Sequence, residues 1–314
     1  MNPALVTCLQ AAPQARTIED VADWWTVWRS LGPANGPAAR AIAGGFAADR
    51  IGWAFASGYQ AALHALVPGV SHDTLAAFCV TEAQGNRPRD IGTTFTPQAD
   101  GMLRIDGSKR WTTLGPAGAV LLIVGRLAEA CDAERPTLRV AQVPVPTPGL
   151  VLKAMLPTRF VPEVPHAEVL MQDLRVSAGA LLPGDGYDCY VKPFRTIEDI
   201  HVTLAVLAYL LREARARRWP AIFIEQVVAA LVLFSELATE DAHASTTHVA
   251  LAGALHVAHR LYADAQPHWA AAGDDPAGMR WQRDAALFEV AGTARRQRAQ
   301  RAWDRLGVEP SEGD

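Results

Sequence analysis

Residues 101–126, GMLRIDGSKRWTTLGPAGAVLLIVGR, decide the fold class of this chain. Short apolar runs at 102–105 and 120–125 are separated by Gly, Asp and Pro, which is typical of strands joined by turns. The same texture extends from residue 75 to about residue 186. We predict further strands there at 78–81, 138–145, 151–154 and 168–171. These strands predict a central β domain, a small barrel or sandwich.

Helical patterns flank this β region on both sides. Before it, residues 18–31 and 51–66 have apolar side chains at helical spacing, and Thr17 can cap the first helix with Asp20 three residues on. After it we predict four helices, two of them apolar all round as in a bundle, at 200–211, 221–237, 250–262 and 282–306.

The order of these patterns predicts an α+β protein with three parts. They are an N-terminal helical domain at 1–75, a central β domain at 76–190, and a C-terminal helical bundle with an acidic tail at 191–314.

Composition excludes several classes of partner. The 314 residues include 29 Lys and Arg and 33 Asp and Glu, a net charge of −4 that gives no attraction to nucleic acid. The most apolar run, 221–238, is short and contains Glu225, Gln226 and Glu236, so we predict no membrane span. The four cysteines lie far apart and form no CxxC pair, which favours a reducing, cytoplasmic location over a disulfide or zinc framework.

Few residues suggest chemistry by themselves. His243, His248, His256 and His259 lie near one another in sequence but lack the Glu-x-x-His pairs of a helical metal site, so we predict no metal. Glu198 opens an apolar helix, where desolvation would raise its pKa and suit a general base. From the residues alone, an N-terminal acid stabilised by the helix dipole is the favoured interpretation.

A basic stripe lies near the C-terminal end of the sequence. It consists of Arg295, Arg296, Arg298, Arg301 and Arg305. We interpret it as a solvated helix face or an ion-pair edge between subunits rather than as a nucleic-acid site.

Four motifs in the right order resemble the acyl-CoA dehydrogenase family. Residues 78–86, FCVTEAQGN, are similar to its "xxTEPxxGSD", and residues 101–113 to its "GGYxLNGxKxWIT". Residues 120–126 resemble the strand that follows the "GGYxLNGxKxWIT" motif in the family. Residues 169–176 and 182–187 resemble "VxFxDVxVPxxxLLGxxGxG". The resemblance covers residues 78–226 well.

This resemblance implies a flavoprotein. In the family, FAD lies between the β domain and the C-terminal bundle, a glutamate takes the α-proton of an acyl-CoA thioester, and a hydride leaves the β-carbon for flavin N5. By motif, Glu198 would be the base, as in a subset similar to isovaleryl- and long-chain-type enzymes, and Asn86 would contact the substrate. The implied cofactor-binding residues are Phe78, Val80, Thr81, Trp111, Thr112, Thr113, Arg215 and Gln226.

The chain also departs from the family pattern. Arg215 and Gln226 keep a family spacing, but Arg218 and Trp219 replace the Phe and Gly of its "RxxFG" segment. The sequence ends soon after Gly307, before a "GGxGY" segment, so we expect a shortened member with less grip on the adenine end of FAD.

Three hypotheses follow. The first is an FAD-dependent acyl-CoA dehydrogenase of fatty acid metabolism that assembles as a homo-oligomer through its C-terminal bundle. The alternative is a catalytically incomplete subunit that lacks tight FAD binding alone and acts with a partner chain. The third, a flavin monooxygenase, is less favoured, because KRWTT at 109–113 is more similar to the dehydrogenases.

Overall fold

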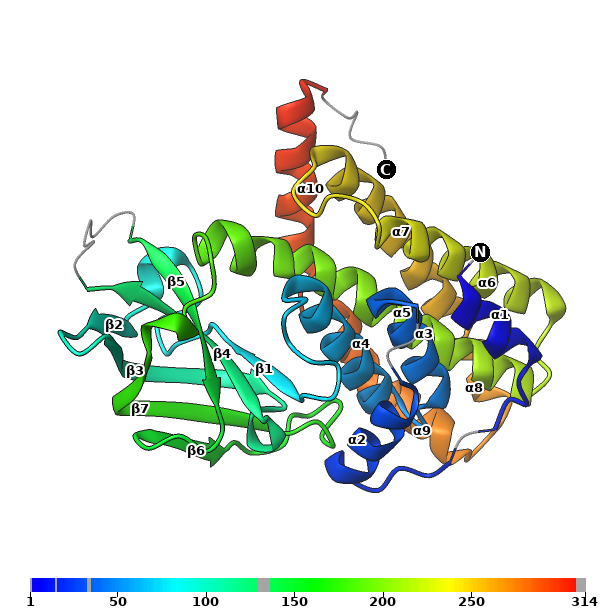
Figure 1. The fold of residues 1–314 in the computed structure, drawn as a ribbon. Coiled ribbons are helices and arrows are strands. Elements are labelled where there is room, and N and C mark those ends of the chain that lie inside the picture. Colours follow the sequence, from blue (N-terminus) through cyan, green and yellow to red (C-terminus); the bar gives the residue numbers. More distant parts are fainter. Residues whose placement is uncertain (1, 15, 33–34, 129–135, 309–314) are drawn as a thin grey trace. The chain divides into compact units, whose positions relative to one another are not determined.

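The computed structural model describes residues 2–14, 16–32, 35–128 and 136–308. The chain divides into a helical unit, made of Met1–Ala65, Arg159–Val161 and Thr196–Asp314, and a sheet unit, made of Leu66–Thr158 and Pro162–Arg195. The predicted α+β class, with helices at both ends of the chain and strands between them, is confirmed (Figure 1). The boundaries predicted at residues 75 and 190 stay predictions.

The sheet unit is built on one seven-stranded sheet. Its order is β1-β4-β2-β3-β7-β6, and β5 pairs with β4. All six predicted strands are present, with β3 and β7 longer than expected; β2 was missed because its TFTP segment is short and ends in proline. The strands are β1 Ala76–Cys79, β2 Thr94–Pro97, β3 Met102–Thr113, β4 Val120–Leu127, β5 Leu138–Pro144, β6 Leu150–Ala154 and β7 His166–Ser177.

Alternate side chains of the strands form the apolar core of the sheet unit. Leu103 and Ile105 of β3 and Val169 of β7 are buried, because every second side chain of a strand lies on the same face. Phe95 of β2 fits against Gly125 of β4, where a Cβ would lie 2.5 Å from the Phe95 ring. This packing holds β2 against β4, and β2 in turn pairs with β3, which carries several candidate site residues.

The helical unit contains helices from both ends of the chain. The prediction of one helix at 282–306 is wrong, because a 3₁₀ turn at Ala285–Glu289 and the poor helix former Gly292 divide it. No helix among the described residues is long and apolar enough to cross a membrane. The helices are α1 Pro3–Gln10, α2 Val21–Ser30, α3 Pro37–Ala47, α4 Ile51–Leu66, α5 Lys192–Ala216, α6 Ala221–Leu237, α7 Ser245–Asp264, α8 Gln266–Ala270, α9 Pro276–Asp284 and α10 Gly292–Leu306.

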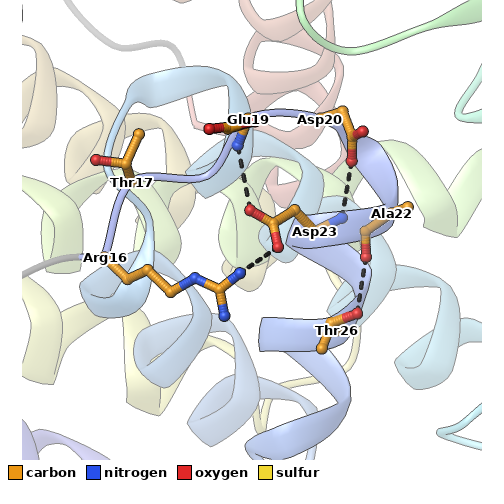
Figure 2. A pocket seen from close by; sticks show the side chains of 7 residues that line it. All are labelled: Arg16, Thr17, Glu19, Asp20, Ala22, Asp23 and Thr26. Atoms are coloured by element: carbon orange, nitrogen blue, oxygen red, sulfur yellow. Dashed lines mark hydrogen bonds and ion pairs between the residues drawn. The ribbon is translucent and has the colours of Figure 1, made fainter.

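The start of α2 differs from the prediction. Asp20, not Thr17, caps the helix, because its carboxylate accepts the Asp23 backbone N–H at 2.9 Å. Asp23 in turn accepts the Glu19 backbone N–H at 3.3 Å and pairs with Arg16. Figure 2 shows these side chains around a polar hollow at the helix start. Asp20 thereby satisfies one open N–H group of the first turn, that of Asp23.

Two glycines bring α3 and α4 into backbone contact with α5. A Cβ on Gly45 of α3 would lie 2.0 Å from the Ala205 carbonyl oxygen. A Cβ on Gly58 of α4 would lie 2.5 Å from the Val202 Cα. Any larger residue would push the helices apart, so these glycines fix where α5 lies among the N-terminal helices.

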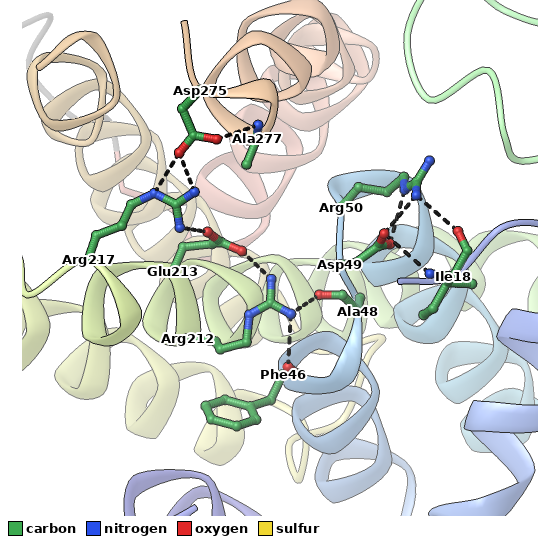
Figure 3. A network of polar contacts seen from close by, with 10 residues as sticks. All are labelled: Ile18, Phe46, Ala48, Asp49, Arg50, Arg212, Glu213, Arg217, Asp275 and Ala277. Carbon is green, nitrogen blue, oxygen red and sulfur yellow. Dashed lines mark hydrogen bonds and ion pairs between the residues drawn. The ribbon is translucent and has the colours of Figure 1, made fainter. Parts of the chain in front are cut away.

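A chain of charged residues connects α3, α5 and the start of α9 (Figure 3). Arg212, which is 2% exposed, donates to the Ala48 carbonyl oxygen and to Glu213. Glu213 also pairs with Arg217, whose Nε donates to Asp275 at 3.1 Å. Each of these charges has a partner of opposite sign, so the network supports the helical unit rather than offering a charge to a ligand.

Candidate active site

A buried ion pair supports the loop that follows β1. Lys109 Nζ lies 2.6 Å from Glu82 Oε1, and the two side chains are 0% and 7% exposed. Glu82 also accepts the Thr93 N–H at 3.0 Å, the Thr93 hydroxyl at 2.8 Å and the Gly92 N–H at 2.7 Å. Burial alone would raise the pKa of Glu82, but Lys109 and these donors outweigh it and lower that pKa. Glu82 is therefore ionised at neutral pH.

This pair positions the end of β1 against β3. Lys109 Nζ also lies 3.4 Å from the Val80 carbonyl oxygen, and the Arg110 N–H donates to the Thr81 carbonyl oxygen at 2.8 Å. Gly107 leaves space for the Thr93 side chain, whose hydroxyl donates to Glu82. A Cβ on Gly107 would lie 2.6 Å from that hydroxyl oxygen. The sequence motifs contained Glu82 and Lys109, but their supporting role was not predicted. The available signal was two residues of opposite charge within the two motifs, Glu82 just after β1 and Lys109 in β3.

Trp111 lies in a β-bulge. Lys109 pairs with Val169 and Thr112 with Ala167, so β3 advances three residues where β7 advances two. Trp111 itself has φ of 56°, a left-handed conformation that is strained for a bulky residue. Its side chain is 51% exposed. The bulge thus turns a large flat aromatic surface outward from the sheet, at a conformational cost that is typical of functional positions.

The residues beside Trp111 differ in what they can offer a ligand. His166 of β7 meets the Trp111 ring edge-on at 6.1 Å, and burial lowers the pKa of His166, which keeps it neutral. Thr113 pairs with His166 and is half-buried. Thr112 is 1% exposed, and its hydroxyl lies against the Cys79 thiol. Burial raises the pKa of that thiol to about 12. Only the backbone of Thr112 could serve a ligand.

The remaining candidates of the sheet unit lie near the start of α5. Phe78 is 6% exposed and packs edge-on against Phe194 at 5.0 Å. Asn86 is exposed, and its Oδ1 accepts a hydrogen bond from Arg195 at 3.4 Å. The proposed substrate residue Asn86 therefore has a cationic neighbour, which suits an anionic or polar ligand group.

In the helical unit, Glu198 lies in the second turn of α5. Because α5 begins at Lys192, the interpretation of Glu198 as a helix N-terminal acid is wrong. Glu198 is half-buried. One turn on, His201 Nδ1 lies 2.8 Å from the Ile197 carbonyl oxygen, and burial lowers the pKa of His201 to about 4. At neutral pH His201 is thus uncharged and donates from Nδ1 to that carbonyl.

Arg215 and Gln226 have different surroundings. Arg215 Nη1 donates to the Cys8 carbonyl oxygen of α1, so part of its guanidinium serves the helical unit itself. Gln226 is exposed on α6. Trp219, which departs from the family pattern, is 8% exposed and packs against Trp269 at 5.0 Å. The altered segment after α5 thus contributes a core aromatic side chain.

In the part of the chain that the structure describes, no three His, Cys, Asp or Glu side chains are grouped as a metal site would need. Cys8, Cys79 and Cys189 are free thiols, and Cys131 lies outside the described residues.

Solved structures with this fold are acyl-CoA dehydrogenases and related proteins. Butyryl-CoA dehydrogenase from Megasphaera elsdenii is similar with a TM-score of 0.67 at 18% identity, covering 91% of this chain and 90% of that one. The apo form of PigA has a TM-score of 0.72 at 15% identity, covering 98% and 97%. A glutaryl-CoA dehydrogenase from Mycobacterium smegmatis, in complex with FADH2, has a TM-score of 0.65 at 13% identity, covering 98% and 95%.

No family model matches the sequence, and no curated protein matches it either. At identities of 13–18% the structural likeness is one of fold. The chain therefore has the acyl-CoA dehydrogenase fold, and the resemblance inferred from the motifs at 78–187 is confirmed at that level.

Proposed function

We propose that this protein is an FAD-dependent dehydrogenase that introduces an α,β double bond into an acyl thioester such as acyl-CoA. The observation that carries the proposal is Trp111, a half-exposed indole held on strained backbone within a β-bulge. Such a surface matches a flat aromatic ring, and strain of this kind persists where a site needs it. The fold of the flavin-dependent neighbours supports the same assignment.

The residues of the sheet unit fit the ring end of FAD. Trp111 would stack beside the isoalloxazine. Thr81, just after β1, and Thr113 of β3 would supply backbone and hydroxyl hydrogen bonds. The buried Glu82–Lys109 pair holds these two segments in register. FAD, when bound, supplies the acceptor for the hydride that leaves the β-carbon of the substrate.

The protein's own part in the reaction is proton removal. We assign Glu198 as the base, its carboxylate taking the proton from the α-carbon while the thioester carbonyl is polarised by hydrogen bonds. Glu198 is half-buried on α5. Asn86, with Arg195 beside it, would hold a polar part of the acyl carrier.

One observation favours a second candidate function. Arg215, one of the residues implied to bind FAD, already donates to the Cys8 carbonyl oxygen. Gln226, by contrast, is exposed on α6 and could contact a second chain. On this alternative the protein is an incomplete subunit, and a partner chain meeting the C-terminal helices completes FAD binding. Homo-oligomeric assembly and a cytoplasmic location likewise stay proposals.

Titration of the purified protein with FAD tests both candidates. The dehydrogenase proposal expects a shifted visible flavin band, retained through gel filtration, that is bleached anaerobically by an acyl-CoA of suitable chain length. Retained flavin with no bleaching by short-, medium-, long- or branched-chain acyl-CoA would contradict dehydrogenation. A protein that ignores FAD alone but retains it when mixed with a larger homologous chain would favour the incomplete subunit.

A further inference from the structure

Two arginines of α10 bind the aspartate that follows Glu198. Arg295 donates to Asp199 Oδ1 from Nε at 2.9 Å and from Nη2 at 2.8 Å. Arg298 donates from Nη2 to Asp199 Oδ2 at 2.6 Å. Asp199 is 7% exposed, so these charge-assisted bonds are shielded from water and both carboxylate oxygens are fixed.

The attachment of α10 to α5 depends on these charges. Among the described residues of α10, Ala302 is the one classed as fully buried, and the helix packs mainly along α7. Arg295 is itself anchored, because its Nη1 donates to the Phe288 carbonyl oxygen at 2.9 Å. We interpreted the basic stripe from the sequence as a solvated helix face or an ion-pair edge between subunits. Two of its residues, Arg295 and Arg298, instead bind Asp199 within the helical unit.

Asp199 in turn fixes the backbone of α5 beside Glu198. Its carbonyl oxygen accepts the Thr203 hydroxyl at 2.6 Å, and its Cα is one peptide unit, about 3.8 Å, from that of Glu198. A side chain held through both oxygens leaves its own Cα, and that of its neighbour, little freedom to move. The orientation of Glu198 then depends on contacts made almost a hundred residues later in the chain.

We infer that Arg295 and Arg298 are positioning residues for Glu198, holding through Asp199 the turn of α5 that carries this carboxylate. The inference rests on the proposed role of Glu198 as the base. Positioning matters because displacing a reacting group by about 1 Å can cost up to about a hundredfold in rate.

The same helix offers matched controls. Arg301 Nε donates to the Gln297 carbonyl oxygen at 3.0 Å, and Arg296 Nη2 donates to the Thr293 hydroxyl at 3.3 Å, so both of these bonds stay within α10. Arg301→Ala removes the same charge and side chain as Arg298→Ala without touching Asp199. Arg298→Lys can replace its single bond to Asp199 Oδ2, because an ammonium also donates to a carboxylate.

The first arm of the test is kinetic and uses the FAD-loaded protein with its best thioester. Arg298→Ala and Asp199→Asn should lower kcat by about ten- to a hundredfold with little change in KM, since the base is displaced while the substrate contacts remain. Arg298→Lys should recover most of kcat, and Arg301→Ala should match the wild type. Equal losses in Arg298→Ala and Arg301→Ala, or none in either, would overturn the inference.

The second arm needs no activity. Amide hydrogen exchange of residues 197–203 should be faster in Arg298→Ala than in Arg301→Ala, while the amides of α4 exchange equally in both. Unchanged exchange at 197–203 would show that the arginines do not hold this turn. Faster exchange with unchanged kcat would show that holding the turn does not position the base. If the wild type does not dehydrogenate thioesters, the proposed function and the base role of Glu198 are refuted. Amide hydrogen exchange would still decide whether Arg298 holds this turn of α5 through Asp199.

Discussion

Lys109 Nζ and Glu82 Oε1 lie 2.6 Å apart inside the sheet unit, and this pair joins the end of β1 to β3. Removing Lys109 leaves the buried Glu82 carboxylate without its countercharge. Lys109→Met should therefore lower the free energy of unfolding by about 3–5 kcal/mol, measured by urea denaturation. The double variant Glu82→Gln/Lys109→Met should lose clearly less. A Lys109→Met protein as stable as the wild type would contradict the structural role of the pair.

The contact between Gly45 and Ala205 predicts opposite effects for two similar substitutions. Gly45→Ala would place a Cβ 2.0 Å from the Ala205 carbonyl oxygen and should destabilise the protein by about 2 kcal/mol or more. Gly253→Ala, in α7 with no atom within 4 Å of the new Cβ, should stabilise it by about 0.5–1 kcal/mol. Thermal unfolding of both variants provides the comparison. A neutral Gly45→Ala would mean that α3 and α5 are further apart.

His201 predicts how stability changes with pH. The pKa of His201 is about 4 in the folded protein, against about 6.5 when unfolded, so between these values the unfolded chain alone takes up the proton. Stability should be unaffected above pH 6.5 and fall as the pH drops toward 4, by about 3 kcal/mol from this group. His201→Gln should flatten that part of the profile. An unchanged slope in the variant would contradict the buried, neutral imidazole.

Trp111 predicts a separation of stability from cofactor binding. Because φ is 56°, Trp111→Gly should be more stable than Trp111→Ala by about 1 kcal/mol, since glycine adopts this conformation without strain. Both variants lack the indole and should bind FAD at least about tenfold more weakly than the wild type. Fluorescence titration with FAD measures this loss. Wild-type affinity in either variant would place the flavin ring elsewhere.

Local patterns predicted most of the fold. The short apolar runs at 102–105 and 120–125 predicted strands. The helical spacing at 51–66 and the long apolar run at 221–237 predicted helices, and the structure confirms all four. β2 was missed because its place depends on pairing with β3 and β4, which its four residues do not reveal. The break at Ala285–Glu289 was missed because helix-compatible residues continue through it.

The site was predicted less completely, because its decisive features are non-local. The motif identified Trp111, but its positive φ arises from the bulge against β7, some fifty residues later in the chain. Glu198 was identified by resemblance, whereas the pairing of Asp199 with Arg295 joins residues 96 positions apart. Neither relationship has a signature within a short window of sequence.

The rate of flavin reduction in the Glu198→Gln variant tests whether Glu198 takes the α-proton of the acyl thioester. The wild type and the variant, both loaded with FAD, are mixed anaerobically with excess acyl-CoA, and the visible flavin band is followed. The matched control is Glu225→Gln, because Glu225 is an exposed glutamate on α6. Glu198→Gln should bind FAD normally but bleach it at least about a thousandfold more slowly, while Glu225→Gln should equal the wild type. Bleaching of Glu198→Gln at the wild-type rate would contradict it.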